Sequence, residues 1–306
     1  MPLQLSRPDP RGDRDGAVAP KTTVLTLQEK RRQGQPITTL TAHDYPTARA
    51  LEAAGVDAIL VGDSLAMVAL GHPDTLSVTM DEMLHHARAV SRGAKTPLLV
   101  GDMPFMSYQA SSDDAVRNAG RFLQEAGMDA VKLEGGRPFA DTVRAIVRAG
   151  IPVQGHIGLR PQSVKELGGF RVQGRTAGAA RGLLEDAHAL EDAGCFSIVL
   201  EAVPERLATY ITEQVQVPTI GIGAGAGTSG QVLVTADVLG LYDALAPRFA
   251  RRYANLGETI AGALRAFRED VEARAFPARD HAYAMPSDEW DAFVAGLPTR
   301  RAAAAR

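Results

Sequence analysis

Short apolar runs alternate with longer amphipathic stretches along most of the chain, and this alternation constrains its fold more than any other feature. The runs have the length and composition of buried strands, and the stretches between them have helical periodicity. Several predicted helices end in a glycine just before the next run, as at Ala54-Gly55 and Ala126-Gly127, which is a common helix-to-strand connection. The predicted strands are Ile37–Thr41, Ala58–Gly62, Leu98–Gly101, Ala130–Leu133, Pro152–Gln154, Ser197–Leu200, Thr219–Ile222 and a weaker one near Leu239–Leu245.

Strands that alternate with helices form parallel βαβ units, which build either an open doubly wound sheet or a closed (β/α)₈ barrel. The residues at the strand ends favour the barrel. In a barrel the carboxyl ends of all strands converge on one mouth, whereas in an open sheet they spread along an edge. Two insertions, Leu65–Arg92 and Ile157–Ala177, are expected to form loops over that mouth. The polar residues at or just after strand ends are Asp63, Asp102, Glu134, His156 and Glu201.

The ends of the chain differ in character from its centre. Residues 1–21 mix charges and prolines without an apolar stretch, which predicts a disordered leader and no signal peptide. The segment Thr22–Gln33 is predicted to be a helix that caps the barrel, with a basic last turn that favours its dipole. We expect a single barrel domain over residues 22–285. The polar tail 286–306 is expected to be a peripheral helix or disordered.

Charge and cysteine content exclude several classes of function. Lys plus Arg number 33 and Asp plus Glu number 36, so the formal net charge is −3 and no basic field is available for nucleic acid or an anionic membrane. The single cysteine, Cys195, allows neither an internal disulfide nor a cysteine zinc site. No apolar run reaches the roughly 18 residues of a membrane span. We therefore expect a cytoplasmic protein with small-molecule ligands and no nucleic-acid or membrane partner.

Three carboxylates at successive strand ends predict a metal site. Asp63, Asp102 and Glu134 each follow an apolar strand, and carboxylate oxygens suit Mg²⁺, which keeps waters and leaves positions for substrate oxygens. The alternative is that each acid caps a helix or turn. Three acids in successive strand-to-helix positions favour the metal or catalytic site.

Lys132, Glu201 and His156 are further candidates around the same mouth. Lys132 and Glu134 are two residues apart, so their side chains point to the same side of the strand. There Lys132 can meet a substrate carboxylate, form a structural ion pair or act as a Schiff-base lysine. Glu201 faces the acids across the mouth and suits a general base, or else caps the next helix. His156 serves equally as a substrate hydrogen-bond donor or as a buried structural histidine.

A glycine-rich segment, GIGAGAG, follows the seventh predicted strand, where many barrels bind phosphate. A dinucleotide-type glycine pattern fits it only weakly, and the glycines equally allow a tight turn. His85 and His86 are adjacent on a predicted helix and face different directions, which makes them poor joint metal ligands. Cys195 precedes a strand and is expected to be a small buried residue.

The motifs together resemble the ketopantoate hydroxymethyltransferase family. The matching stretches are TAHDYPTA, VGDSLAM, GDMPFMSY, VKLEGG, GHIGLRPQSVKELGGFRVQGR, LEAVP and IGIGAG, in family order from about Thr22 to Arg279. The resemblance implies a barrel of the phosphoenolpyruvate/isocitrate-lyase-like kind, Mg²⁺ dependence and a homo-oligomer, often a decamer. It also implies transfer of a hydroxymethyl group from 5,10-methylenetetrahydrofolate to 3-methyl-2-oxobutanoate. The product would be 2-dehydropantoate, in the first committed step of pantothenate biosynthesis.

Carried over by position, the resemblance assigns roles to particular residues. Asp63 and Asp102 look like the Mg²⁺ ligands, with Glu134 as a third, directly or through water. Asp63, Ser64, Asp102 and Lys132 look like the substrate-binding residues, and Glu201 looks like the proton acceptor. The chain departs from the family at Ala66, where glycine is usual, and at Ser229 and Ala236, where many members have Asp and His. Those departures concern folate affinity or loop packing before they concern the chemistry.

Two other functions are alternatives to this one. One is a Mg²⁺-dependent carbon–carbon lyase for 2-oxo acids on the same barrel. Such lyases commonly carry a catalytic cysteine in a KKCGH-like motif, and no similar motif occurs in the sequence. The other is a non-catalytic phosphate- or nucleotide-binding sensor built around GIGAGAG, which leaves the three strand-end acids unexplained.

Overall fold

The computed structural model describes residues 20–241 and 247–297. Its contacts divide the chain into two units, Met1–Ala254 and Asn255–Arg306. The expected leader lies almost entirely outside the described residues, as do residues 298–306 of the expected tail. The contacts divide the chain at Ala254 and not at residue 285, the sequence-based bound of the barrel domain, which stays a prediction.

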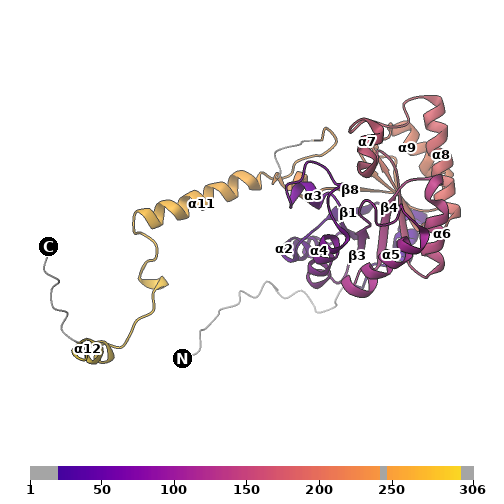
Figure 1. The fold of residues 1–306 in the computed structure, drawn as a ribbon. Coiled ribbons are helices and arrows are strands. Elements are labelled where there is room, and N and C mark those ends of the chain that lie inside the picture. Colours follow the sequence, from indigo (N-terminus) through magenta and orange to yellow (C-terminus); the bar gives the residue numbers. More distant parts are fainter. Residues whose placement is uncertain (1–19, 242–246, 298–306) are drawn as a thin grey trace, which may run out of the picture. The chain divides into compact units, whose positions relative to one another are not determined.

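The first unit is a closed barrel of eight parallel strands, as the sequence predicted (Figure 1). Each strand pairs with its sequence neighbours, and β1 pairs with β8 to close the ring. A closed ring leaves no strand edge unpaired. The strands are β1 (Ile37–Thr41), β2 (Ala58–Val61), β3 (Leu98–Asp102), β4 (Ala130–Glu134), β5 (Val153–Gly158), β6 (Ser197–Glu201), β7 (Thr219–Ile222) and β8 (Gly230–Leu233).

The predicted position of the eighth strand was wrong. Leu239 ends helix α10 (Thr235–Leu239), Gly240 is its left-handed cap, and residues 242–246 of the predicted run lie outside the described residues. The strand that closes the barrel is instead GQVL, at the end of the glycine-rich segment. Gly230 is needed there because an added Cβ would lie 2.3 Å from the carbonyl oxygen of Ile37. A strand that starts with glycine and glutamine lacks the apolar signal on which the prediction relied.

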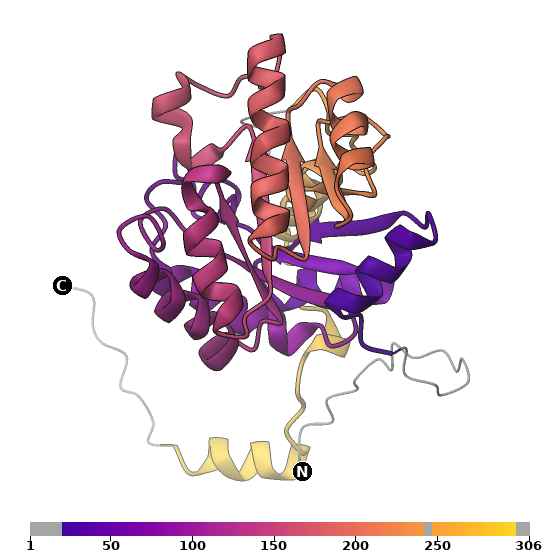
Figure 2. The ribbon, with the colours of Figure 1, turned by 90° about the vertical axis from the view of Figure 1, so that its right-hand side faces the viewer.

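Helices form the outer layer of the barrel (Figures 1 and 2). Several begin at a side-chain cap, such as Asp44, Thr79 or Ser111, whose oxygen accepts a backbone N–H of the first turn. The outer elements are α2 (Tyr45–Ala54), α3 (Leu65–Val68), α4 (Met80–Gly93), α5 (Ser112–Ala126), η1 (Arg137–Phe139), α6 (Ala140–Arg148), η2 (Pro161–Ser163), α7 (Val164–Leu167), α8 (Ala177–Asp192) and α9 (Glu205–Gln214).

The two insertions differ from each other in the structure. Much of Leu65–Arg92 is α4, an outer helix that packs on α2 and α5, so this stretch is not wholly a loop over the mouth. The sequence-based prediction took the whole insertion as a loop because no predicted strand separates α4 from the rest of it. Ile157–Ala177 contains only η2 and the single-turn α7, and residues of this stretch do line the cavity at the mouth.

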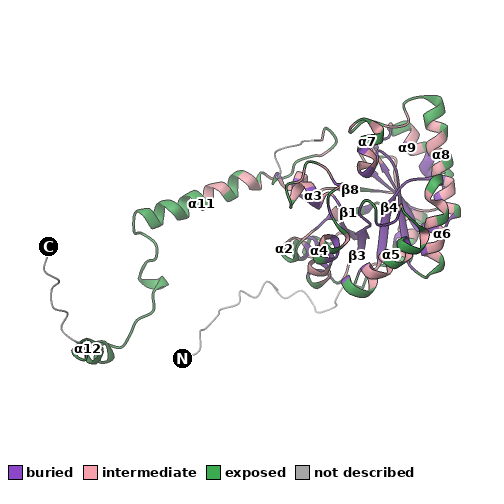
Figure 3. Cartoon of the chain, in the orientation of Figure 1, coloured by how far each residue is buried: buried purple, intermediate pink, exposed green. Residues whose placement is uncertain are grey.

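Helix α1 (Val24–Arg32) caps the barrel, as expected. Leu27 is buried in the same apolar cluster as Ile37, Leu98 and other residues of the barrel interior. Arg31 donates to the carbonyls of Thr212, Val215 and Gln216. A second and larger cluster lies between the sheet and the outer helices. Most strand residues are buried (Figure 3), although Thr38 of β1 and Gln231 of β8 are exposed.

The second unit has a different character. It contains α11 (Leu256–Glu272), η3 (Arg279–His281) and α12 (Ser287–Ala295), and none of its described residues is buried. On α11 four apolar side chains with the spacing of one helical face are exposed: Ile260, Leu264, Phe267 and Val271. No helix among the described residues is long and apolar enough to cross a membrane.

We predict opposite effects of alanine at two glycines that lie close in sequence. In Gly101→Ala the new Cβ would lie 2.4 Å from the Phe122 ring, so overpacking should lower the free energy of unfolding by about 1–3 kcal/mol. Gly120→Ala on α5 has open space around it and should raise that free energy by about 0.5–1 kcal/mol. Urea denaturation of both variants measures the difference. Equal effects would show that β3 and α5 do not pack as described.

Candidate active site

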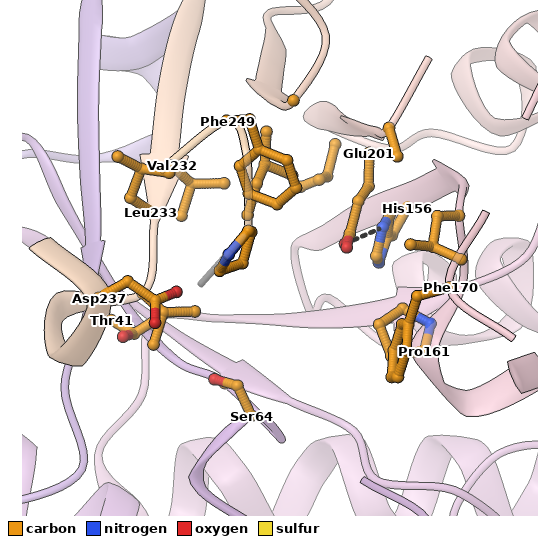
Figure 4. A pocket seen from close by; sticks show the side chains of 18 of the residues that line it. Thr41, Ser64, His156, Pro161, Phe170, Glu201, Val232, Leu233, Asp237 and Phe249 are labelled. Atoms are coloured by element: carbon orange, nitrogen blue, oxygen red, sulfur yellow. Dashed lines mark ion pairs between the residues drawn. The ribbon is translucent and has the colours of Figure 1, made fainter. Parts of the chain in front are cut away.

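The carboxyl ends of the strands surround one cavity of about 980 Å³ (Figure 4). It opens at the mouth where the sequence placed the candidate residues. All six site residues predicted from the sequence line it, together with His156: Asp63, Ser64, Asp102, Lys132, Glu134 and Glu201.

Strand register explains why these side chains meet. Asp102 of β3 is aligned with Lys132 of β4, and Glu134 of β4 is aligned with His156 of β5. Glu201 of β6 pairs with Gly158, two residues beyond His156 on β5. Neighbouring parallel strands therefore present their polar side chains at similar depth in the barrel. The strand β5 runs to Gly158, beyond its predicted end, so His156 lies within the strand.

A buried ion pair links β3 to β4. Lys132 Nζ donates to Asp102 Oδ1 at 2.6 Å, and both side chains are almost completely buried. The other carboxylate oxygen, Oδ2, accepts the backbone N–H of Asp63 at 3.1 Å. Burial lowers the pKa of Lys132, but the charges of Asp102, Glu134 and Asp63 outweigh it and raise that pKa above the usual value for lysine. Lys132 is therefore a permanent ammonium, which makes a Schiff-base role unfavourable.

Asp63 and Asp102 are close enough to oppose each other's ionisation. Burial, then the charges of Asp102 and Glu134, hold the pKa of Asp63 well above its usual range. Burial also raises the pKa of Asp102, despite the opposing effect of Lys132. Two buried carboxylates in this situation need either a shared proton or a bound cation.

His156 lies between two carboxylates. Its Nδ1 is 3.6 Å from Glu134 Oε1, and its Nε2 is 3.2 Å from Glu201 Oε2, the second pair being drawn in Figure 4. Burial and Lys132 lower the pKa of His156, but the two glutamates outweigh them and raise it to about 9. At neutral pH the imidazole is therefore protonated and has no free lone pair, which favours Glu201 over His156 as a proton acceptor.

Comparison with known proteins decides the family. A model of the ketopantoate hydroxymethyltransferase family matches residues 21–279. The chain belongs to this family. The 3-methyl-2-oxobutanoate hydroxymethyltransferase of Syntrophobacter fumaroxidans is 60% identical over 262 residues, covering 86% of this chain and 92% of the relative. The protein of the same name from Syntrophus aciditrophicus is 54% identical over 263 residues, covering 86% and 97%. Membership makes the chain an enzyme, a transferase, and the non-catalytic sensor alternative was wrong.

Solved structures of low identity share the fold. A phosphonopyruvate hydrolase matches with a TM-score of 0.56 at 15% identity, covering 91% of this chain and 99% of that one. A 2,3-dimethylmalate lyase, described as a member of the PEP mutase/isocitrate lyase superfamily, matches with a TM-score of 0.55 at 17% identity, covering 90% and 98%. The barrel of this ketopantoate hydroxymethyltransferase family member thus has the fold of these structures.

The residues that depart from the family pattern do not line the cavity. Ala66 and Ala236 are buried. The Ser229 hydroxyl accepts from Arg31 of the capping helix and from the backbone N–H of Thr219, the first residue of β7. Ser229 therefore lies at the amino ends of the strands, away from the mouth. The glycine-rich segment contributes Gly223 and Gly225 to the cavity wall and forms no separate site there.

The remaining sequence candidates lie outside the site. Cys195 is buried, and burial raises the pKa of its thiol to about 12. His86 of α4 contacts the carbonyl oxygen of His43 through Nδ1, and neither His85 nor His86 lines the cavity. We therefore assign these three residues no role in the chemistry of the cavity.

Sequence reasoning missed two polar residues behind the carboxylates, Tyr108 and Gln162. Both are almost completely buried. Gln162 donates from its side chain to Asp63 and from its main chain to Glu134, and Tyr108 donates to Gln162. They lie within two of the family-like stretches, GDMPFMSY and GHIGLRPQSVKELGGFRVQGR. A phenol and an amide have no charge or ligand spacing that would single them out.

Proposed function

We propose that this enzyme transfers a hydroxymethyl group from 5,10-methylenetetrahydrofolate to 3-methyl-2-oxobutanoate in the presence of Mg²⁺, giving 2-dehydropantoate for pantothenate biosynthesis. Its relatives carry the name of that reaction. The observation that supports it most is the single cavity in which buried acids and Lys132 face Glu201. This arrangement suits a 2-oxo acid that must be held by its carboxylate and keto group and deprotonated at the adjacent carbon.

The buried acids fit a divalent cation of the magnesium type. Asp63 and Asp102 would hold it directly and Glu134 through water, since no three acidic, histidine or cysteine side chains within residues 20–241 and 247–297 gather closely enough to hold an ion together. Glu134 Oε1 is buried and accepts no hydrogen bond from the described residues. Mg²⁺ commonly uses one or two carboxylates and keeps waters. When bound, it would supply Lewis-acid stabilisation of developing negative charge on the keto oxygen.

Lys132 and Ser64 would bind the substrate carboxylate. Lys132 donates one of its three N–H groups to Asp102, and the other two are available for a carboxylate in the cavity. Ser64 lies at the start of α3, directly after Asp63, and its side chain lines the cavity (Figure 4). Fixing the carboxylate at Lys132 orients the reacting carbon before any bond changes.

Glu201 would remove the proton from C3 of the keto acid. It ends β6, lines the cavity and is partly exposed, so it can reach a bound substrate. His156 Nε2 lies 3.2 Å from one of its carboxylate oxygens, Oε2, and a carboxylate that faces the substrate suits a general base. The carbanion formed at C3 then attacks the methylene carbon of the folate as the first of its two C–N bonds breaks. The second C–N bond breaks with uptake of one water, which supplies the hydroxyl oxygen, and tetrahydrofolate leaves.

The outer part of the cavity is apolar and suits the folate. Phe170 and Val172 of the stretch after β5 line it, as do Leu233 of β8 and Phe249 (Figure 4). Aromatic and aliphatic walls of this kind pack against a flat heterocycle and exclude water from the reacting carbon.

We also propose a cytoplasmic homo-oligomer, with a decamer as the family's common form. The exposed apolar face of α11, defined above, supports association. A large exposed apolar patch is a typical interaction surface, and soluble oligomers are mostly symmetric copies of one chain.

Turnover with both substrates tests the reaction. We expect 2-dehydropantoate to form only when 3-methyl-2-oxobutanoate, methylenetetrahydrofolate and Mg²⁺ are all present, and EDTA to abolish the product. Mass spectrometry of the product measures it. Consumption of the keto acid at the same rate without folate would instead indicate the carbon–carbon lyase alternative.

Glu201→Gln tests the proton acceptor. The wild type should exchange the C3 proton of 3-methyl-2-oxobutanoate for deuterium from the solvent without folate. Because glutamine keeps the size but cannot accept the proton, exchange should fall by about 10²–10⁴-fold. Glu205→Gln is the matched control, since Glu205 lines the same cavity and packs against Gly225, and it should exchange normally. NMR measures the exchange. A wild-type exchange rate in Glu201→Gln would show that Glu201 is not the proton acceptor and has only a structural role.

Light scattering tests the oligomer. We expect a mass that is a multiple of 32.4 kDa. Leu264→Asp should lower it by placing a charge on the apolar face of α11, whereas Arg265→Asp, beside that face, should leave it unchanged. A wild-type mass near 32.4 kDa would contradict the proposal.

A further inference from the structure

We propose that Gln162 is a positioning residue that fixes the orientation of Asp63 for cation binding. The inference rests on the proposed function, because it concerns the acids assigned there to Mg²⁺. Gln162 belongs to η2, in the stretch after β5, and its side chain is 95% buried. It does not line the cavity, although the preceding residue, Pro161, does (Figure 4). Gln162 therefore approaches the carboxylates from behind.

The side-chain amide of Gln162 uses both of its ends. Nε2 donates to Asp63 Oδ2 at 3.0 Å and to the carbonyl oxygen of Met103 at 3.0 Å. Oε1 accepts from the Tyr108 hydroxyl at 2.8 Å and from Gln109 Nε2 at 3.1 Å. With two donations and two acceptances, the hydrogen-bonding capacity of the amide is filled.

The chemistry of the partners determines which way the amide faces. The backbone carbonyl of Met103 can only accept a hydrogen bond, so the NH₂ end must face it, and the second N–H of that end then reaches Asp63 Oδ2. A flipped amide would set its oxygen against two acceptors, with both left unpaired in a buried place. On the other side, the Tyr108 hydroxyl lies 2.8 Å from Oε1 and donates to it.

These bonds form a chain from β4 to β2. The backbone N–H of Glu134 donates to the Tyr108 hydroxyl at 3.1 Å, Tyr108 donates to Gln162, and Gln162 donates to Asp63. The backbone N–H of Gln162 also donates to Glu134 Oε2 at 3.0 Å. One residue thus holds one oxygen of each of two acids. Buried chains of this kind polarise each other and are stronger than separate hydrogen bonds.

The consequence concerns the other oxygen of each acid. Gln162 holds Oδ2 of Asp63, and the hydrogen bonds among the described residues do not include Oδ1 of that acid. With Oε2 held by the Gln162 backbone, Glu134 Oε1 accepts no hydrogen bond from the described residues and has His156 Nδ1 3.6 Å away. Gln162 therefore leaves Asp63 Oδ1 for a cation, and Glu134 Oε1 for a water on that cation beside His156. Removing such outer partners of metal ligands typically costs about 10–100-fold in metal affinity.

The test is a Mn²⁺ titration of the full-length protein, without substrates, followed by electron paramagnetic resonance. Gln162→Met keeps the side-chain volume but removes both ends of the amide, and we expect Mn²⁺ affinity to fall by about 10–100-fold. The matched control is Gln154→Met. Gln154 is equally buried, and its side chain donates to Ser197 of β6 and not to an acid. Gln154→Met should bind Mn²⁺ as the wild type does.

Two further variants separate the possible outcomes. Gln162→Asn keeps an amide but shortens its reach to Asp63, so it should also lose affinity, and it serves if Gln162→Met does not fold. Asp63→Asn should bind Mn²⁺ least of all. In turnover, Gln162→Met should raise the Mg²⁺ concentration needed for half-maximal rate and recover near wild-type kcat at saturating Mg²⁺, which a merely structural defect would not do.

Wild-type Mn²⁺ affinity in folded Gln162→Met or Gln162→Asn, with weak binding in Asp63→Asn, would overturn the positioning role and leave the proposed metal site intact. Wild-type affinity in Asp63→Asn would overturn the metal assignment and the positioning role together. An equal loss of affinity in Gln154→Met and Gln162→Met would show a general effect of core substitution and would also overturn the proposal.

Discussion

The concentration of negative charge inside the barrel mouth is the constraint on which the rest of the site depends. Asp63, Asp102 and Glu134 are buried side by side. Burial by itself disfavours the ionised form of each of them. Two cationic side chains compensate: Lys132 pairs with Asp102, and a protonated His156 lies between Glu134 and Glu201. Two cationic side chains facing four carboxylates suit the addition of a divalent cation. Charges that would destabilise an ordinary hydrophobic core thus define a binding site here.

The short spacing between neighbouring strands brings these negative charges together. Asp63 follows the end of β2, whereas Asp102 and Glu134 lie on the next two strands, so the separation of the acids follows from the strand spacing of the sheet. Glycine permits tight packing behind one of them, because Gly101, next to Asp102, lies against the Phe122 ring. At the other, amino end of the barrel, Gly230 lets β8 approach β1 and close the ring. Acids carried by the backbone of a closed barrel are positioned before a substrate binds, which is the preorganisation that transition-state stabilisation requires.

The stretch after β5 joins the two halves of the cavity. Gln162, near its start, contacts the acids at the inner end. Phe170 and Val172, further along, line the apolar outer end. One segment of chain therefore borders both the charged floor and the apolar wall. This explains why it is long and carries no complete helix of its own: its backbone is shaped by what it contacts on the barrel.

The sequence by itself determined the barrel and the acids at its mouth, because strand-helix alternation and charged residues at strand ends are local patterns. It also identified Lys132 and Glu201, since charge next to an apolar strand is conspicuous. It misplaced the eighth strand, because Gly230 and Gln231 gain strand structure only from their pairing with β1 and β7. Only the tertiary structure decided that His156 is held between two glutamates and that Tyr108 and Gln162 support Asp63 from behind. Those roles depend on contacts between residues as far apart as Asp63 and Gln162, and an uncharged amide reveals its partner only once the chain has folded.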